Sequence, residues 1–279
     1  MCGRYVMARA SADLVAGGGA EPTRLELTPN WNIAPTARVP ILVELFDGQD
    51  AGGGTHRELH LARWGLVPPW ATDLSVGSRA FNARSETVVS KPTFRSAVRS
   101  RRCAVPADGY YEWRSPEPGA IGPDGRAARK QPWYVHPAAE EAGPIWFAGL
   151  YEWWKDAEAD ASGHDAWVLS TTILTTAAPD PAADEPDGHD EGDTALAELG
   201  RLHDRLPIGL DTATMEAWLA PGRLSGADEA AALVERVRAQ AHETARGWRM
   251  RPADPAVGNV RNNGPQLIRG PRERQEPLL

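Results

Sequence analysis

The chain has little cysteine and no long apolar run. Its 279 residues contain two cysteines, Cys2 and Cys103, too few for a disulfide framework, and a reducing compartment would keep both as thiols. No apolar run approaches the ~20 residues needed to cross a bilayer, and the chain does not start with the basic and then apolar pattern of a signal peptide. Cysteine and histidine clusters at zinc spacing are also missing. The sequence therefore predicts a cytoplasmic protein with no metal, no cofactor and no membrane partner.

The charge is acidic overall but unevenly distributed. The composition, 42% hydrophobic and 24% charged, is that of an ordinary globular protein, and the net charge is −8. Residues 152–165 and 180–198 hold a large excess of Asp and Glu, and the second segment has no Lys or Arg at all. The rest of the chain is mildly basic as a result. Such a distribution is compatible with a nucleic-acid partner but does not demand one.

The residue pattern predicts more strands than helices. Strands are expected at 3–9, 39–46, 58–66, 131–136, 145–153 and 166–173, with two more in 102–114 around a turn at 106–109. Helices are expected at 11–16, 86–98, 195–201, 212–219 and 227–243, a rigid turn at 30–35, a flexible excursion at 177–195 and an irregular tail at 261–279. Strands and helices do not alternate regularly. We therefore expect an α+β fold, a single mixed domain on a curved, mostly antiparallel β-sheet.

Cys2 is the residue with the most distinctive chemistry. Removal of Met1 would leave Cys2 with a free α-amine and a thiol on adjacent carbons. The ordinary pKa values of these groups, ~7.7–8.0 and ~8.5, give both of them nucleophilic fractions at neutral pH. An aldehyde would form a Schiff base with the amine, and the thiol would then close a thiazolidine ring. The alternative is that Cys2 is simply the second residue of a loose terminus.

Six segments combine polar, charged and aromatic residues in ways that a protein core does not require. They are MCGRY at 1–5, NIAPT at 32–36, WGLVPPW at 64–70, FNARSET at 81–87, RCAVPADGYYEW at 102–113 and LHDRLP at 202–207. In this order they resemble the SOS response-associated peptidase (SRAP) family, whose members shield abasic sites in single-stranded DNA by covalent crosslinking. The resemblance implies a SRAP-like catalytic domain over 1–219 with an acidic insertion at about 177–198. Residues 220–279 would be a C-terminal extension, a helix and an Arg-rich tail, packed on or appended to that domain.

The resemblance also implies a set of catalytic residues. Cys2 would be the nucleophile, and Asn82 would hydrogen-bond near its amine or the sugar. Glu112 would take a proton from the amine, and His203 would be the general acid and base. The alternatives are a loop cap for Asn82, a half-exposed strand glutamate for Glu112, and a structural histidine bonded to Asp204 or a backbone carbonyl for His203.

A second set of residues would bind DNA. Arg4 and Arg84 would bind phosphates next to the lesion, and Arg84 otherwise would form a surface ion pair. Trp64 and Trp70 would offer faces for base stacking, or else belong to the core. Thr171 aligns with a family threonine near a phosphate, although Ser170 and Thr172 leave the register open. The family pattern also includes Arg205, and Cys103 is expected in the core.

Three classes of function are consistent with these residues. The first is an enzyme that crosslinks itself to abasic DNA, with peptidase activity that removes Met1 and an AP-lyase activity. The second is an amidohydrolase or protease with an N-terminal cysteine nucleophile, and the third is a noncatalytic single-strand-binding module. The joint presence of Cys2, Glu112 and His203 favours the first. Its partner would be single-stranded DNA with abasic sites, bound by a monomer that associates with the nucleoid on damage; whether Met1 leaves by self-cleavage or through an aminopeptidase stays open.

Overall fold

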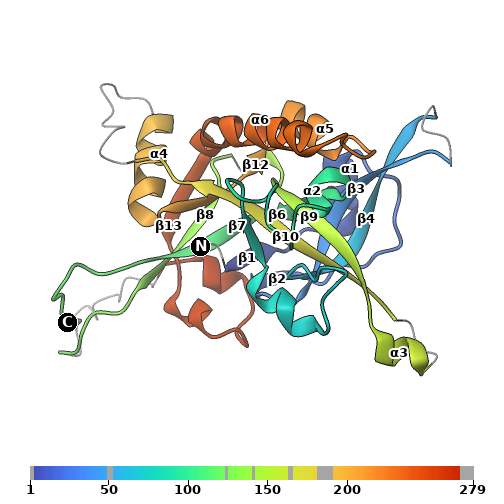
Figure 1. The fold of residues 1–279 in the computed structure, drawn as a ribbon. Helices are drawn as coiled ribbons and strands as arrows, with labels where there is room; N and C mark the ends of the chain where they lie inside the picture. Colours follow the sequence, from blue (N-terminus) through green and yellow to red (C-terminus); the bar gives the residue numbers. More distant parts are fainter. Residues whose placement is uncertain are drawn as a thin grey trace.

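The computed structural model describes residues 3–48, 53–122, 125–139, 142–162, 166–180 and 191–270. Met1 and Cys2 therefore lie outside the described residues, as do 181–190 of the predicted excursion and 271–279 of the predicted tail. Two β-sheets form the centre of the molecule, with α4, α5 and α6 on one side and the short 3₁₀ helices on the other (Figure 1). Every helix in the described ranges is too short or too polar to cross a lipid bilayer.

The larger sheet carries most of the chain. It consists of β3 (Arg38–Phe46), β4 (Thr55–Trp64), β5 (Asn82–Arg84), β6 (Arg102–Ala107), β9 (Ile145–Lys155), β10 (Trp167–Ala177), β11 (Arg205–Pro207) and β12 (Gly209–Leu210). The strand order is β11-β10-β4-β3-β6-β9-β12, with β5 beside β10. Because β10 pairs with β9 as well as β4, strands β3, β4, β6, β9 and β10 close into a ring. The pairs of β10 with β4 and β5 are parallel and the others are antiparallel.

The smaller sheet is antiparallel, in the order β13-β8-β7-β1-β2. Its strands are β1 (Arg4–Met7), β2 (Asn30–Ile33), β7 (Gly109–Arg114), β8 (Gln131–Pro137) and β13 (Trp248–Pro252). The helices are α1 (Ser11–Gly18), α2 (Ala97–Ser100), α3 (Ala157–Ala161), α4 (Glu191–Leu202), α5 (Thr212–Leu219) and α6 (Ala227–Arg246), and the 3₁₀ helices are η1 (Leu74–Arg79), η3 (Pro255–Gly258) and η4 (Pro265–Ile268). Since β13 pairs with β8, the chain beyond residue 219 completes this sheet.

The main core lies where the two sheets meet. Tyr5 of β1 is fully buried, and its ring packs edge-on against Trp64 of β4 with 5.1 Å between the ring centroids. The outer helices cover this core with apolar faces; α6 buries Ala230, Val234, Val237, Ala241 and Ala245, which recur at helical spacing. At α5, the Asp211 side chain accepts a hydrogen bond from the Thr214 backbone N–H and forms a capping box that fixes the start of the helix.

The expected fold class is confirmed, and so are most of the expected elements. The helix at 212–219 and the strand at 39–46 match their observed bounds closely. The expected helix at 86–98 is wrong: Pro92 lacks a backbone N–H, and the segment forms successive turns before α2 begins at Ala97. The expected turn at 30–35 is largely β2, because pairing with β1 overrides the weak strand propensity of asparagine. The part of the excursion from Glu191 onward is helix α4.

Candidate functional site

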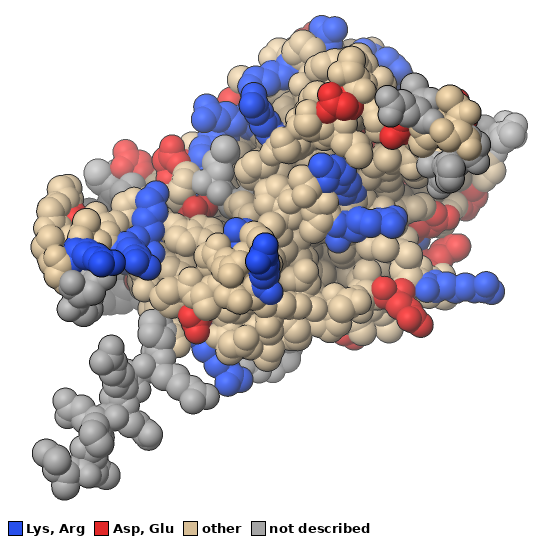
Figure 2. All heavy atoms as spheres, turned by 90° about the horizontal axis from the view of Figure 1, so that it is seen from below, with Lys and Arg blue, Asp and Glu red and all other residues tan. Residues whose placement is uncertain are grey.

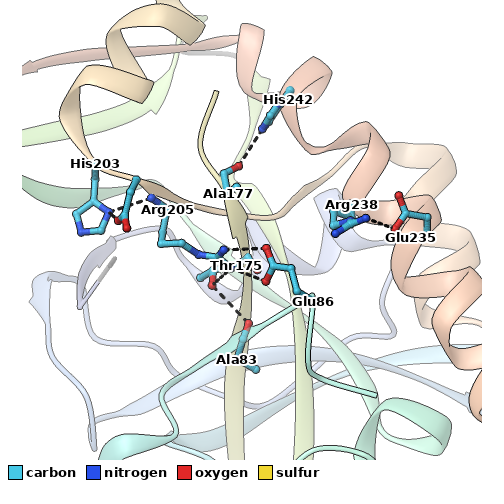
Figure 3. A network of polar contacts seen from close by, with 10 residues as sticks. Ala83, Glu86, Thr175, Ala177, His203, Arg205, Glu235, Arg238 and His242 are labelled. Atoms are coloured by element: carbon cyan, nitrogen blue, oxygen red, sulfur yellow. Dashed lines mark hydrogen bonds and ion pairs between the residues drawn. The ribbon is translucent and has the colours of Figure 1, made fainter. Parts of the chain in front are cut away.

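Several of the predicted site residues lie around one end of β10. Asn82, Ala83 and Arg84 of β5 pair in parallel with Ile173, Leu174 and Thr175, while Arg205 of β11 pairs with Ala177 from the other side. The chain thus brings residues more than a hundred positions apart to the same strand end, as Figure 3 shows. Asn82, Arg84, His203 and Arg205 belong to one cluster.

Arg205 links β11 to β10 and to the turn that follows β5. Its guanidinium forms a bidentate ion pair with Glu86, with Nη1–Oε1 and Nη2–Oε2 distances of 2.8 and 2.9 Å, and Nη2 also donates to the Thr175 carbonyl at 2.8 Å (Figure 3). The hydrogen bond from Arg205 lowers the pKa of Glu86 below its ordinary value. Only 11% of the Arg205 side chain is exposed. These contacts make Arg205 a positioning residue for the adjoining turn, and its contact with DNA stays a prediction.

His203 lies in that turn with two competing contacts at one nitrogen. Its Nδ1 lies 3.0 Å from the Arg205 backbone N–H, which donates to it, and 2.7 Å from Asp204 Oδ1. Nδ1 without a proton accepts from the amide, and Nδ1 bearing a proton donates to Asp204. The side chain is 27% exposed and so remains accessible. The contact with Asp204, considered above as the structural alternative, is present, and the role of His203 as general acid and base stays a prediction.

A cationic groove adjoins Asn82 and Arg84. It has a volume of about 740 Å³ and is lined by Ser75, Val76, Ser78, Arg79, Ala80, Asn82, Arg84, Lys91, Thr93 and Phe94, of which none is acidic. Figure 2 shows the molecule from below the view of Figure 1; Lys and Arg side chains are spread over the middle and the upper and left parts of this face, and most Asp and Glu side chains lie toward its edges. In the part of the chain that the structure describes, no three His, Cys, Asp or Glu side chains converge as metal ligands would. The groove is suited to a polyanion.

Arg4 and Glu112 lie together on the smaller sheet. Arg4 of β1 pairs with Tyr111 of β7, so the next residue on β7, Glu112, lies beside Gly3 at the start of the described chain. Glu112 is 5% exposed rather than half-exposed, and its Oε1 accepts a hydrogen bond from the Trp113 backbone N–H. Glu112 therefore lies beside Gly3, the residue that follows Cys2.

The C-terminal segment holds Arg4 in place through Asn32. Arg4 Nη1 donates to Asn32 Oδ1 at 2.9 Å and to the Val257 carbonyl at 2.8 Å, and burial lowers the pKa of the guanidinium. Asn32 is buried, and its Nδ2 donates to the carbonyls of Val257, Asn259 and Asn262. Sequence reasoning gave Asn32 no role of its own and the extension no catalytic part. The feature of the sequence that could have pointed to a role for Asn32 is its place in the NIAPT motif.

Trp64 connects the segment that carries Arg4 with the segment that carries Asn82. Its ring contacts Tyr5, which follows Arg4, and Phe81, which precedes Asn82, and its Nε1 donates to the Phe81 carbonyl at 2.8 Å. Trp64 is fully buried, so the predicted base-stacking face is wrong and the core interpretation is correct. Trp70 is 60% exposed, and its stacking role stays a prediction.

The threonine prediction also needs correction. Thr171 is fully buried, its Oγ1 donates to the Leu150 carbonyl at 2.9 Å, and it contacts Cys103 Sγ. It therefore cannot reach a phosphate. The threonine beside Arg84 is Thr175, four residues further along β10, where a second Thr-Thr pair precedes Ala177. Cys103 is a core residue as expected, and burial raises the pKa of its thiol to about 12, which leaves it unreactive.

Comparisons with known proteins agree with the motifs. The family model described as SOS response associated peptidase (SRAP) matches residues 1–260. The abasic site processing protein YoqW of Bacillus subtilis is 27% identical over 96% of this chain and 99% of its own, and YoaM of the same organism is 30% identical over 81% of this chain and 82% of its own. A crystal structure of a protein from Bacteroides thetaiotaomicron shares the fold with a TM-score of 0.66 and 20% identity, covering 97% of this chain and all of the other.

Proposed function

From the premise that the chain belongs to the SOS response associated peptidase family, we propose that it processes abasic sites in single-stranded DNA by forming a covalent adduct through Cys2. The names of its relatives YoqW and YoaM give the lesion. The observation that carries the proposal is the cluster of Asn82, Arg84 and His203 at the end of β10, next to a cationic groove without an acidic residue. The proposal includes removal of Met1, which frees the amine, as the peptidase activity.

The adduct forms in two steps that together release one water. The amine nitrogen of Cys2 attacks the aldehyde carbon of the ring-opened sugar, and the carbinolamine loses its hydroxyl as water to give an imine. The thiol sulfur then adds to the imine carbon while the thiol proton moves to nitrogen, which closes the thiazolidine. Glu112 accepts a proton from the amine, His203 protonates the sugar oxygen and the departing hydroxyl, and Arg4 and Arg84 bind the flanking phosphates.

The test uses a single-stranded oligonucleotide with one abasic site. Purified protein should lack Met1, and after incubation its intact mass should rise by the mass of the oligonucleotide less one water, in an adduct stable to denaturant. Cys2→Ala keeps an amine but no thiol, so its adduct should survive only after borohydride reduction and should otherwise promote strand cleavage by β-elimination, the proposed lyase activity. A durable Cys2→Ala adduct without borohydride would contradict the thiazolidine mechanism.

The same assay examines His203. His203→Ala should slow adduct formation by about 10²-fold, the usual contribution of a positioned acid and base, and leave the mass of the product unchanged. His242→Ala is a matched control, because His242 lies on α6 and its ring contacts the Ala177 carbonyl of the same strand end (Figure 3). Equal rates for the two variants would assign His203 a structural role.

A further inference from the structure

A second groove lies between the β3–β4 and β9–β10 strand pairs. Its volume is about 570 Å³, and its lining residues are Leu25, Thr36, Arg38, Leu59, His60, Leu61, Arg63, Trp153, Trp167, Val168 and Leu169. None of them is acidic, although the chain as a whole carries a net charge of −8. The groove thus combines aromatic and basic side chains, and neither the proposed chemistry at Cys2 nor the cluster around β10's end uses it.

Two tryptophans on the groove are open to solvent. Trp153 is 43% and Trp167 is 54% exposed. Trp153 pairs across the strands with Leu169, two residues from Trp167, so both indoles lie on the same face of the β9–β10 pair as diagonal neighbours. Burial in the core is the usual role of tryptophan, whereas here about half of each residue is exposed, with Lys155 Nζ 5.9 Å from the centroid of the Trp167 ring. Flat, exposed rings of this kind offer stacking platforms.

Two arginines lie on the opposite wall. Arg38 and Arg63 are direct cross-strand partners on β3 and β4, so their side chains lie on one face. Arg63 Nη1 donates to the Thr36 carbonyl at 2.9 Å, and Thr36 has φ of 78°, a backbone conformation that is strained for a β-branched residue. Three acids close in sequence to the lining residues have partners: Glu58 contacts His60 at 2.8 Å, Asp160 contacts Lys155 at 2.6 Å and Glu152 contacts Arg101 at 2.7 Å.

This groove is separate from the site described above. Arg63 and Trp64 are consecutive residues of β4, so their side chains leave opposite faces of the strand. Trp64 points to Tyr5 and Phe81, which adjoin Arg4 and Asn82. Arg63 therefore points away from that site.

We propose that the groove is a second binding site for single-stranded nucleic acid, with bases stacked on Trp153 and Trp167 and phosphates bound by Arg38 and Arg63. The pairing of exposed indoles with arginines, and the lack of acids in the lining, match the chemistry of a nucleotide strand: every base has a face to stack and every linkage carries a negative charge. An apolar peptide would use the indoles but not the arginines. The site needs no lesion and no covalent step, so it stands apart from the proposed function.

The test measures binding of an undamaged oligothymidylate, longer than the ~4–16 nucleotides that a single-strand site commonly covers, by fluorescence anisotropy. The double variant Trp153→Ala, Trp167→Ala should bind it about tenfold more weakly, while the double variant with Phe at both positions, which keeps the stacking faces, should stay close to wild type. Arg38→Ala should lower the slope of log K against log salt by about 0.7, and Arg238→Ala on α6 should not. Thermal unfolding of each variant checks that the fold is retained.

The outcomes are distinguishable. Unchanged affinity in the double alanine variant would overturn the proposal. Equal loss in the alanine and phenylalanine variants would also overturn it, because stacking would then not be the cause. If the wild type binds the undamaged strand through these tryptophans but forms no adduct with an abasic oligonucleotide, the second site is supported and only the covalent mechanism fails.

Discussion

Asn32 shows how one buried side chain connects distant parts of the chain. Its amide bonds three carbonyls between Val257 and Asn262, and its oxygen accepts from Arg4. The carbonyl partners lie more than 220 residues away in sequence. Hydrogen bonds of this kind leave no periodic pattern, which is why sequence reasoning identified the motif but not what it binds.

Asn32→Ala should be strongly destabilising. The substitution leaves buried carbonyls without a donor and should lower the free energy of unfolding by about 2–3 kcal/mol. It should also slow adduct formation, because Arg4 loses a partner that fixes its guanidinium. Urea unfolding and adduct assays measure the two effects.

Asn263→Ala is the matched control for this variant. Asn263 is exposed, and its Oδ1 accepts from the Trp31 backbone N–H, so its loss should cost less. Equal losses of stability in the two variants would contradict the role assigned to Asn32.

At the scale of elements, local rules located several helices, although not the one expected at 86–98, and pairing with distant strands decided the short strands. The helices predicted at 212–219 and 227–243 correspond to α5 and α6, whose starts and buried faces are set by local features, the Asp211 capping box and apolar residues at helical spacing. Strands β2 and β13 were missed, because Asn30, Arg249 and Arg251 have little strand propensity and are held by pairing with β1 and β8. The strand propensity of a segment carries no information about a partner strand that lies far away in sequence.

The Glu86–Arg205 ion pair links the turn after β5 to β11. It should affect both the rate of adduct formation and the free energy of unfolding. Glu86→Gln removes the charge that fixes Arg205, so the His203 turn should be held less firmly and adduct formation should slow by about tenfold. Because the folded pKa of Glu86 lies below the ordinary value of 4.5, the pair contributes its full stability above about pH 4.5 and loses it as the pH falls through the folded pKa. The stability difference between wild type and variant should therefore shrink in acid.

Urea unfolding from pH 7 to pH 3 measures this difference. Glu235→Gln is the matched control: Glu235 pairs with Arg238 three residues further along α6, is 59% exposed and lies away from the His203 turn (Figure 3). That variant should form the adduct at the wild-type rate. A stability difference for Glu86→Gln that grows as the pH falls would contradict the assignment.

For the whole molecule, the sequence located the parts of the site but not their arrangement. The motifs predicted the segments that contain Asn82, Arg84, Glu112 and His203. They did not predict that β10 brings β5 and β11 together, and they left open whether Trp64 stacks on bases or belongs to the core, where it is fully buried. Trp64 and Trp70 belong to one motif, yet only Trp70 reaches solvent, and that difference arises from three-dimensional packing.

The distribution of charge over the molecule leads to the last prediction. Within α4, Glu191 and Asp193 pair with Arg249 and Arg246, so the charges of these acids are already compensated in the fold.

The four acids of residues 181–190, which lie outside the described ranges, add negative charge to a protein that we propose binds DNA. Replacing them with amides (Asp184→Asn, Glu185→Gln, Asp187→Asn, Asp190→Asn) should tighten noncovalent DNA binding several-fold at low salt. The gain should vanish near 1 M salt, where the Debye length is only about 3 Å. Anisotropy titrations across salt concentrations measure it, and a gain that persists at high salt would mean that this segment acts by short-range contact instead of long-range repulsion.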